Sequence, residues 1–228
     1  MNLLLDLGNS KLKWKTSKEG DLGQSAAYSS LPRFAPDSFE AILISSVRDA
    51  RATKNVLERL GLLNHPRLLI ASTLNPNFKC DYDRPEKLGV DRFLAALGAS
   101  RSESRCIVVD AGTALTIDLV DNGFRGGVIM LGVGRSIQSL LAGTDLIKEG
   151  VTASDGDLPT NTASAVERGA WLQAVGAINE FRRRYAPAFP ILVTGGDGEM
   201  LVANLEGASY HADLVLDGLV HAEYEELT

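Results

Sequence analysis

The sequence LLLDLGN at residues 3–9 returns as IVVDAGT at residues 107–113. Each stretch has three apolar residues, then Asp, an apolar residue, Gly, and finally Asn or Thr. The apolar runs predict buried strands, and the Gly-containing ends predict tight turns. A single match of this kind could arise by chance, because apolar-Asp-x-Gly is common where a strand ends.

A second pair of segments repeats in the same order. ILISSV at residues 42–47 runs into a predicted helix that ends near Leu60, and ILVTGG at residues 191–196 runs into a helical segment that ends near Leu205. Two ordered repeats indicate an internal duplication, with its seam near residues 101–105.

The alternation of strands and helices predicts an α/β class. We expect two domains, residues 1–102 and residues 103–228. Residues 18–40 carry no clear pattern, and residues 72–88 are polar, contain two prolines and are predicted to be loop. The other expected elements are strands over 12–16, 41–47 and 67–71, a helix from Asp49 as N-cap to Leu60, and a helix over 90–100.

The composition restricts the class of protein. With 29 acidic and 23 basic residues the net charge is −6, which argues against a general nucleic-acid binder. Cys80 and Cys106 form no disulfide framework or metal motif, which favours a cytoplasmic protein with reduced thiols. Asp6 interrupts the first apolar run, so we expect no signal peptide, and no stretch has the length of a membrane span.

Two Asp-x-Gly turns at equivalent places predict a phosphate clamp. Glycine lets backbone amides approach a phosphate, and the carboxylates of Asp6 and Asp110 suit a hard cation beside it. If the turns face each other across a cleft, they can hold the polyphosphate of ATP. The alternatives are Asp residues that only stabilise their turns and lysines on a solvated strand face. The side chains that add donors or charge are Asn9, Ser10, Lys11, Lys13 and Thr113.

At these residues the chain resembles the type III pantothenate kinases. DLGNSKLK at residues 6–13 is similar to their first phosphate motif, and VDAGTALT at residues 109–116 is similar to their second. GVDR at residues 89–92 resembles their substrate motif, with Tyr82 at the expected distance upstream. Further matches in family order are residues 126–129, 161–162 and 194–196.

The resemblance implies a duplicated actin-like (ribonuclease H-like) two-domain fold with mixed sheets and an interdomain cleft. It implies ATP-dependent phosphorylation of pantothenate to 4′-phosphopantothenate, the first step of coenzyme A biosynthesis. It also implies a requirement for Mg²⁺ and for a monovalent cation, K⁺ or NH₄⁺. The expected assembly is a homodimer with the pantothenate site near the subunit interface.

Carried over singly, the family roles make Asp91 the general base, Asp110 a ligand of the monovalent cation, and Asp6 a ligand of Mg²⁺ through water. Arg92 is a fork donor, and we hypothesise that it holds the pantothenate carboxylate. The implied ATP-binding residues are Asp6, Leu7, Gly8, Asn9, Ser10, Lys11, Leu12, Lys13 and Thr113. The implied pantothenate-binding residues are Tyr82, Gly89, Val90, Asp91, Arg92 and Thr162.

Simpler structural roles stay open for three of these residues. Asp91 could be a helix N-cap beside a salt-bridged Arg92, Thr162 could be the N-cap of a helix, and Tyr82 could be a core aromatic. The chain also has Leu131-Gly132 where the family usually has Pro-Gly, which puts the rigidity of that turn in question.

Two other functions also remain open. The chain could phosphorylate another small alcohol on the same fold, because the fold alone does not fix the substrate. It could instead be a nucleotide-bound regulatory protein that lost the chemistry. The presence of Asp6, Asp91 and Asp110 together argues against that loss.

Overall fold

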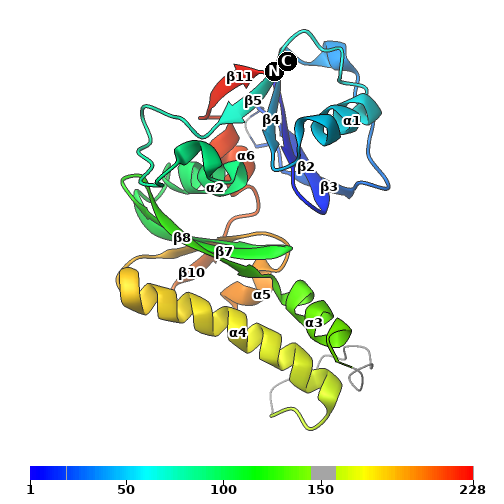
Figure 1. Ribbon diagram of the computed structural model, residues 1–228. Helices are drawn as coiled ribbons and strands as arrows, with labels where there is room; N and C mark the ends of the chain where they lie inside the picture. Colours follow the sequence, from blue (N-terminus) through cyan, green and yellow to red (C-terminus); the bar gives the residue numbers. More distant parts are fainter. Residues whose placement is uncertain (19, 145–157, 228) are drawn as a thin grey trace. The chain divides into compact units, whose positions relative to one another are not determined.

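The computed structural model describes residues 1–18, 20–144 and 158–227 and contains two mixed sheets (Figure 1). The first sheet has the strand order β11-β5-β4-β1-β2-β3. Its strands are β1 (Leu3–Leu7), β2 (Lys11–Thr16), β3 (Gln24–Ala27), β4 (Ile42–Ser46), β5 (Leu68–Ser72) and β11 (Glu223–Glu226).

The second sheet has the order β10-β9-β6-β7-β8, so it repeats the first with each strand number raised by five, apart from the added β11. This correspondence confirms the duplicated architecture predicted from the two sequence repeats. The strands are β6 (Arg105–Ala111), β7 (Ala114–Asp121), β8 (Phe124–Leu131), β9 (Ile191–Thr194) and β10 (Ala208–Tyr210).

The duplication extends to the register of the strands. Strand β1 runs parallel to β4 with Leu3 beside Ile42, and β6 runs parallel to β9 with Ile107 beside Ile191. These are the same residues that the two sequence repeats align.

The chain forms two compact units. The first contains residues 1–106, 120–126 and 212–228, and the second contains residues 107–119 and 127–211. The helices of the first unit are α1 (Ala50–Leu60), α2 (Val90–Ala99), α6 (Leu214–Leu219) and the 3₁₀ turns η1 (Pro36–Ser38) and η2 (Pro85–Lys87). Those of the second are α3 (Val133–Ala142), α4 (Thr162–Tyr185) and α5 (Gly198–Val202).

Helix α1 covers one face of the first sheet. Its carboxylate cap is the predicted one, because Asp49 Oδ1 accepts a 2.7 Å hydrogen bond from the backbone N–H of Ala52. Gly61 ends the helix in the left-handed region, at φ +79°. The buried residues of α1, which include Val56 and Leu57, pack in one core with Leu3, Leu5 and Leu7 of β1.

Helices α2 and α6 cover the opposite face of this sheet (Figure 1). Packing against α6 fixes the position of α2. They pack at backbone distance, because a methyl group built on Gly98 would lie 2.2 Å from the carbonyl oxygen of Leu214. One built on Gly218 would lie 1.9 Å from the carbonyl oxygen of Leu94. Only glycine at these two positions permits this approach.

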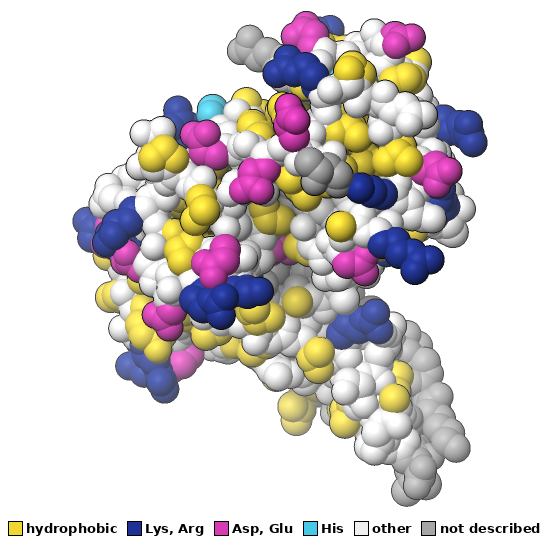
Figure 2. Space-filling view, turned by 45° about the horizontal axis from the view of Figure 1, so that its top comes forward, with side chains coloured by type: hydrophobic (Ala, Val, Ile, Leu, Met, Phe, Trp, Pro, Cys, Tyr) yellow, Lys and Arg dark blue, Asp and Glu magenta, His cyan; other side chains and the backbone are white. Residues whose placement is uncertain are grey.

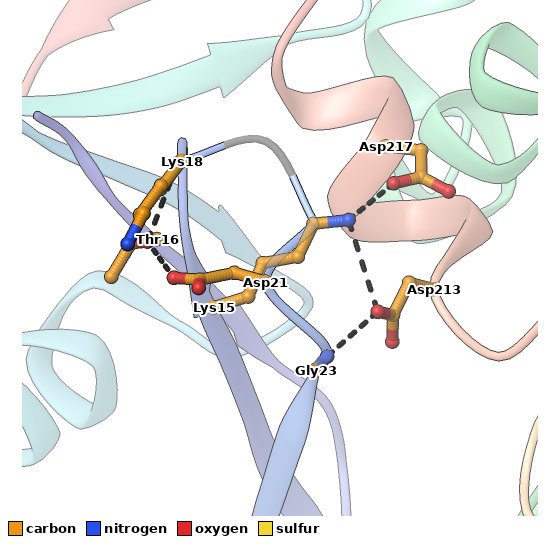
Figure 3. A network of polar contacts seen from close by, with 7 residues as sticks. All are labelled: Lys15, Thr16, Lys18, Asp21, Gly23, Asp213 and Asp217. Atoms are coloured by element: carbon orange, nitrogen blue, oxygen red, sulfur yellow. Dashed lines mark hydrogen bonds and ion pairs between the residues drawn. The ribbon is translucent and has the colours of Figure 1, made fainter.

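A partly buried lysine joins the first hairpin to α6. Lys15 on β2 forms ion pairs with Asp213 and Asp217, and the backbone N–H of Gly23 donates a 2.8 Å hydrogen bond to Asp213 (Figure 3). The side chain of Lys15 is only 12% exposed. The network therefore holds the segment after β2 against the start of α6.

The core of the second unit lies between its sheet and α4. The strand residues Ile107, Val109 and Ile117 pack with Ile178 and Phe181 of α4.

Within the described residues, no helix is both long and apolar enough to cross a bilayer. On the face seen in Figure 2, acidic and basic side chains are interspersed.

Candidate functional site

Asp6 lies on β1, one of the two central strands of the first sheet, and is 8% exposed. Ser45 stands beside it on β4 and donates a 2.9 Å hydrogen bond from its hydroxyl to Asp6 Oδ1. Lys13 lies directly opposite on β2, so its side chain is on the same face of the sheet. Asp6 therefore has an oriented carboxylate, and a lysine occupies the opposite position on the neighbouring strand.

The turn after Asp6 presents its tip to solvent. Asn9, Ser10 and Lys11 are exposed, as a phosphate-binding turn requires. Leu7 and Leu12 are fully buried in the core of the sheet, so they can reach a ligand only through their main chain. The residues predicted to bind ATP over 6–13 are thus of two kinds. The side chains at the tip of the turn are exposed, and those at its base are buried in the core.

Two residues that sequence analysis missed support this turn from behind. Tyr28 donates a 2.7 Å hydrogen bond to the carbonyl oxygen of Gly8. Arg48 lies 4.4 Å from the centre of the Tyr28 ring, and its Nη1 is 3.5 Å from the same oxygen and 3.4 Å from that of Asn9. Burial raises the pKa of Tyr28 despite the lowering effect of Arg48, so its hydroxyl stays protonated and donates at neutral pH.

The turn of the second unit is formed by Gly112 and Thr113. The backbone N–H of Gly112 donates to the carbonyl oxygen of Ala114, and that of Gly132 donates to the carbonyl oxygen of Thr113 at 3.1 Å. A methyl group on Gly132 would lie 1.9 Å from the carbonyl oxygen of Gly112. Gly132 thus packs directly on the turn, while Thr113 keeps an exposed side chain. The neighbouring Leu131 is 55% exposed.

Asp110 occupies the position in the second sheet that Asp6 occupies in the first. It is half-buried and stands beside Thr194 of β9 in register. Gly195 follows at φ +94°, and a methyl group there would lie 2.6 Å from Asp110 Oδ1 and 2.4 Å from the carbonyl oxygen of Ala111. The glycine therefore lets the end of β9 approach the carboxylate.

Asp91 lies in the first turn of α2 and is half-buried. The N-cap residue is Gly89, so the alternative of Asp91 as the cap is wrong. Its Oδ1 instead accepts a 2.8 Å hydrogen bond from the backbone N–H of Arg92. Burial raises the pKa of Asp91, outweighing that hydrogen bond and the charge of Arg92, which lower it. A raised pKa makes this carboxylate a better proton acceptor than an exposed aspartate.

Arg92 and Tyr82 are brought together around a third residue, Phe124, which sequence analysis missed. Arg92 is 6% exposed, and the carbon of its guanidinium lies 5.5 Å from the Phe124 ring centre and 6.0 Å from that of Tyr82. The two rings meet edge to face at 6.1 Å. The half-buried Tyr82 is thus a packed aromatic as well as a neighbour of Arg92.

The segment before Tyr82 is tied to Phe124 by its main chain. The backbone N–H of Phe124 donates to the carbonyl oxygen of Lys79 at 2.8 Å, and that of Asp81 donates to the carbonyl oxygen of Phe124 at 2.9 Å. Asp81 also pairs with Lys79 and Arg125, and hydrogen bonds from these two side chains hold its pKa below the ordinary value. These contacts hold the end of the predicted loop beside β8.

Thr162 is the first residue of α4 and its side chain is exposed. The N-cap is the preceding Asn161, whose side chain accepts a 2.9 Å hydrogen bond from the backbone N–H of Ser164. The alternative of Thr162 as the cap is therefore wrong. Its hydroxyl is not used to cap the helix.

The described residues contain no group of three or more His, Cys, Asp or Glu side chains that could hold a metal ion by themselves. Asp6 and Asp110 are single carboxylates. This suits Mg²⁺, which commonly binds through one or two carboxylates together with water and substrate phosphates.

Solved structures with the same fold include proteins described as activators and as sugar kinases. A Campylobacter jejuni protein described as belonging to the Baf family of transcriptional activators matches with a TM-score of 0.66 and 22% identity, over 96% of both chains. Component A of (R)-2-hydroxyglutaryl-CoA dehydratase from Acidaminococcus fermentans matches with a TM-score of 0.55 and 11% identity, covering 97% and 96%. At these identities the likeness establishes the fold alone, which is the predicted actin-like one.

Sequence relatives define the family. The family profile described as type III pantothenate kinase matches residues 2–184. A type III pantothenate kinase from Psychrobacter arcticus is 35% identical, covering 95% of this chain and 96% of that protein. One from Azoarcus sp. (strain BH72) is 32% identical, covering 96% and 89%. The chain therefore belongs to the type III pantothenate kinase family.

Proposed function

We propose that this protein transfers the γ-phosphoryl group of ATP to the 4′-hydroxyl of pantothenate, giving 4′-phosphopantothenate for coenzyme A synthesis. The observation that carries the proposal is the half-buried Asp91, with its raised pKa, next to the cluster of Arg92, Tyr82 and Phe124. A carboxylate with a raised pKa directly before an arginine supports a role for Asp91 as the proton acceptor in a chain of this family.

The reaction needs an acceptor oxygen, a proton acceptor and a charge clamp. The hydroxyl oxygen of pantothenate forms a bond to the γ-phosphorus while the bond from that phosphorus to the bridging oxygen breaks. The hydroxyl proton passes to the carboxylate of Asp91, and ADP leaves. Because the transition state is loose, Asp91 contributes late, and its removal should cost about 10²–10⁴-fold in rate.

Pantothenate has a carboxylate at the end remote from that hydroxyl. Arg92 would bind the carboxylate, since its guanidinium is a fork donor that lies against the rings of Tyr82 and Phe124. Tyr82, with the main chain of Gly89 and Val90, would line the same site, and the exposed hydroxyl of Thr162 would add a donor.

Two turns would hold ATP. The exposed Asn9, Ser10 and Lys11, together with Lys13 and the main chain from Asp6 to Leu12, would meet its phosphates, and Thr113 would add a hydroxyl. Asp6 would hold Mg²⁺ through water, and the ion would neutralise phosphate charge when bound. Asp110 would bind K⁺ or NH₄⁺.

The remaining parts of the proposal concern the whole molecule. We infer a cytoplasmic homodimer in which the pantothenate site lies near the subunit interface, and a chain divided by its duplication into domains 1–102 and 103–228. Light scattering on the purified protein tests the dimer directly, because a mass of one chain would contradict it.

The decisive experiment is coupled ADP release with ATP, Mg²⁺ and pantothenate, in K⁺ and then in Na⁺ buffer. We expect turnover that depends on pantothenate, requires K⁺, and falls at least about 100-fold in Asp91→Asn. Folded protein that binds ATP but releases no ADP would overturn the proposal in favour of a regulatory protein. Turnover with a different alcohol alone would reassign the substrate.

A further inference from the structure

A pocket of about 310 Å³ lies in the first unit along α1. It is separate from the group formed by Asp91, Arg92 and Tyr82. The residues that line it are Tyr28, Arg48, Asp49, Arg51, Ala52, Asn55, Val56 and Arg59. We call it the arginine pocket.

The arginine pocket concentrates positive charge on a chain whose net charge is −6. Among the residues that the structure describes, Arg48, Arg51 and Arg59 form no ion pair. The one carboxylate in the lining, Asp49, already accepts the hydrogen bond that caps α1. Three guanidinium groups therefore line one pocket without an acidic partner among the described residues.

The guanidinium of Arg48 has donors that could form further hydrogen bonds. Its Nε is buried and has no hydrogen-bond partner among the described residues. Its contacts to the carbonyl oxygens of Gly8 and Asn9 measure 3.5 and 3.4 Å, longer than the roughly 2.7–2.9 Å of a strong charge-assisted hydrogen bond. Stacking on Tyr28 at 4.4 Å holds the guanidinium in place.

The other two arginines are placed by the helix. Arg51 and Arg59 are eight residues apart on α1 with Asn55 midway, so all three lie on one face. Arg59 donates a hydrogen bond to the carbonyl oxygen of Tyr28, which holds it toward the same cavity. Arg51 makes no such contact in the described chain and is free to engage a ligand.

We propose that the arginine pocket binds a phosphate group, either inorganic phosphate or the phosphate of a small ester. Planar fork donors match the geometry of phosphate oxygens. The volume is at the lower end of the roughly 300–1,000 Å³ of ligand sites, which favours a small anion over a whole nucleotide. Arg48 touches the carbonyl side of the Gly8–Asn9 turn, so this ligand is distinct from the transferred phosphate of ATP.

The proposal does not depend on the kinase activity, and a binding measurement tests it. Inorganic phosphate and glycerol 2-phosphate are titrated calorimetrically at constant ionic strength in chloride buffer. The protein is first saturated with Mg²⁺ and the β,γ-imido analogue of ATP, and binding of that analogue is measured separately. The variants are Arg51→Glu and, as the matched control, Lys54→Glu, since Lys54 is an exposed cation of α1 outside the pocket lining.

We expect binding to persist with the analogue present, to weaken about tenfold or more in Arg51→Glu, and to change little in Lys54→Glu. Tighter binding of glycerol 2-phosphate would identify an ester as the occupant, and tighter binding of inorganic phosphate would identify the free anion. The proposal is overturned if the unaltered protein binds neither probe, if the analogue displaces them, or if both variants lose binding equally.

Discussion

The hydroxyl of Ser45 donates a hydrogen bond to Oδ1 of Asp6 from the neighbouring parallel strand. In the second sheet Thr194 stands beside Asp110 in the same register. Both carboxylates of the duplicated turns therefore lie next to a residue with a hydroxyl at an equivalent place on the adjacent strand. The pairing suggests that orienting the carboxylate is part of what the repeat preserves.

Replacing Ser45 with alanine should weaken both the fold and the use of ATP. Asp6 is buried, so losing a hydrogen bond to a charged group should cost about 1–3 kcal/mol of unfolding free energy. We expect the KM for ATP to rise while the KM for pantothenate changes little. Chemical denaturation and steady-state kinetics measure the two effects.

The control for that variant is Ser45→Thr, the residue that the second sheet carries at the matching position. It keeps the hydroxyl and should retain most of the ATP affinity. An alanine variant with an unaltered KM for ATP would separate Ser45 from the phosphate site.

Asp91→Asn should lose activity without losing stability. The pKa of Asp91 is raised in the folded protein, so the folded state binds its proton more tightly than the unfolded state does. Its contribution to stability is therefore present at low pH and lost as pH rises through the folded pKa. At neutral pH the asparagine variant should have a melting temperature at least as high as that of the unaltered protein.

The same pKa predicts the acid limb of the pH–rate profile. The kcat/KM for pantothenate should fall as pH drops, with a midpoint above 3.8, the ordinary value for an aspartate. A melting temperature well below normal in Asp91→Asn would mean that the carboxylate has a structural role instead.

Phe124→Leu should impair pantothenate binding more than ATP binding. The ring is fully buried and lies against both Arg92 and Tyr82, so the smaller side chain should loosen the arginine. We expect a several-fold higher KM for pantothenate and a stability loss of about 1–3 kcal/mol, because the smaller side chain leaves a cavity. Phe78→Leu, which alters the buried pair of Phe78 and Phe93, is the matched control.

The two variants should lose comparable stability, and only the one at Phe124 should shift the KM for pantothenate. Equal effects on both Michaelis constants in the Phe124 variant would contradict a positioning role.

Gly218→Ala should destabilise the protein although alanine is the better helix former. The new methyl group would lie 1.9 Å from the carbonyl oxygen of Leu94, and overpacking of this kind costs about 1–3 kcal/mol. The intrinsic gain of about 1 kcal/mol in helix propensity offsets only part of that cost. Urea denaturation gives the difference directly.

Gly176→Ala provides the opposite case on α4. None of the described residues has a heavy atom within 4 Å of a methyl group at that position, so the substitution should be neutral or stabilising. If both variants were equally stable, the close packing of α2 on α6 would not contribute to the stability of the fold.

Local sequence was enough to predict the parts of the site whose structure is determined locally. The Asp-x-Gly turns and the Asp49 cap could be predicted from the sequence, because each depends on a few consecutive residues. Phe124 was not, because it joins Arg92 and Tyr82 only after strands far apart in sequence have paired. No periodicity in residues 121–125 marks the ring as part of a binding cluster.

The same limit applies to the support behind the first turn. Tyr28 follows β3, a strand with mostly exposed residues and no apolar alternation, so residues 18–40 gave no usable pattern. In the sequence, Arg48 cannot be distinguished from an ordinary surface cation. Its role behind the first turn becomes apparent only from its stacking on Tyr28 in the structure. Strand β11, with the sequence EYEE, could not be predicted either, because it forms a strand only by pairing with β5.

That last pairing has a consequence for synthesis on the ribosome. β11 and α6 belong to the first unit, yet their residues are translated after all of the second unit. The first unit can thus complete its sheet with β11 only when the end of the chain has emerged. The same is true of α6, which covers the sheet face on which α2 lies. A nascent chain halted before residue 212 would expose that face, which makes this unit the last to mature.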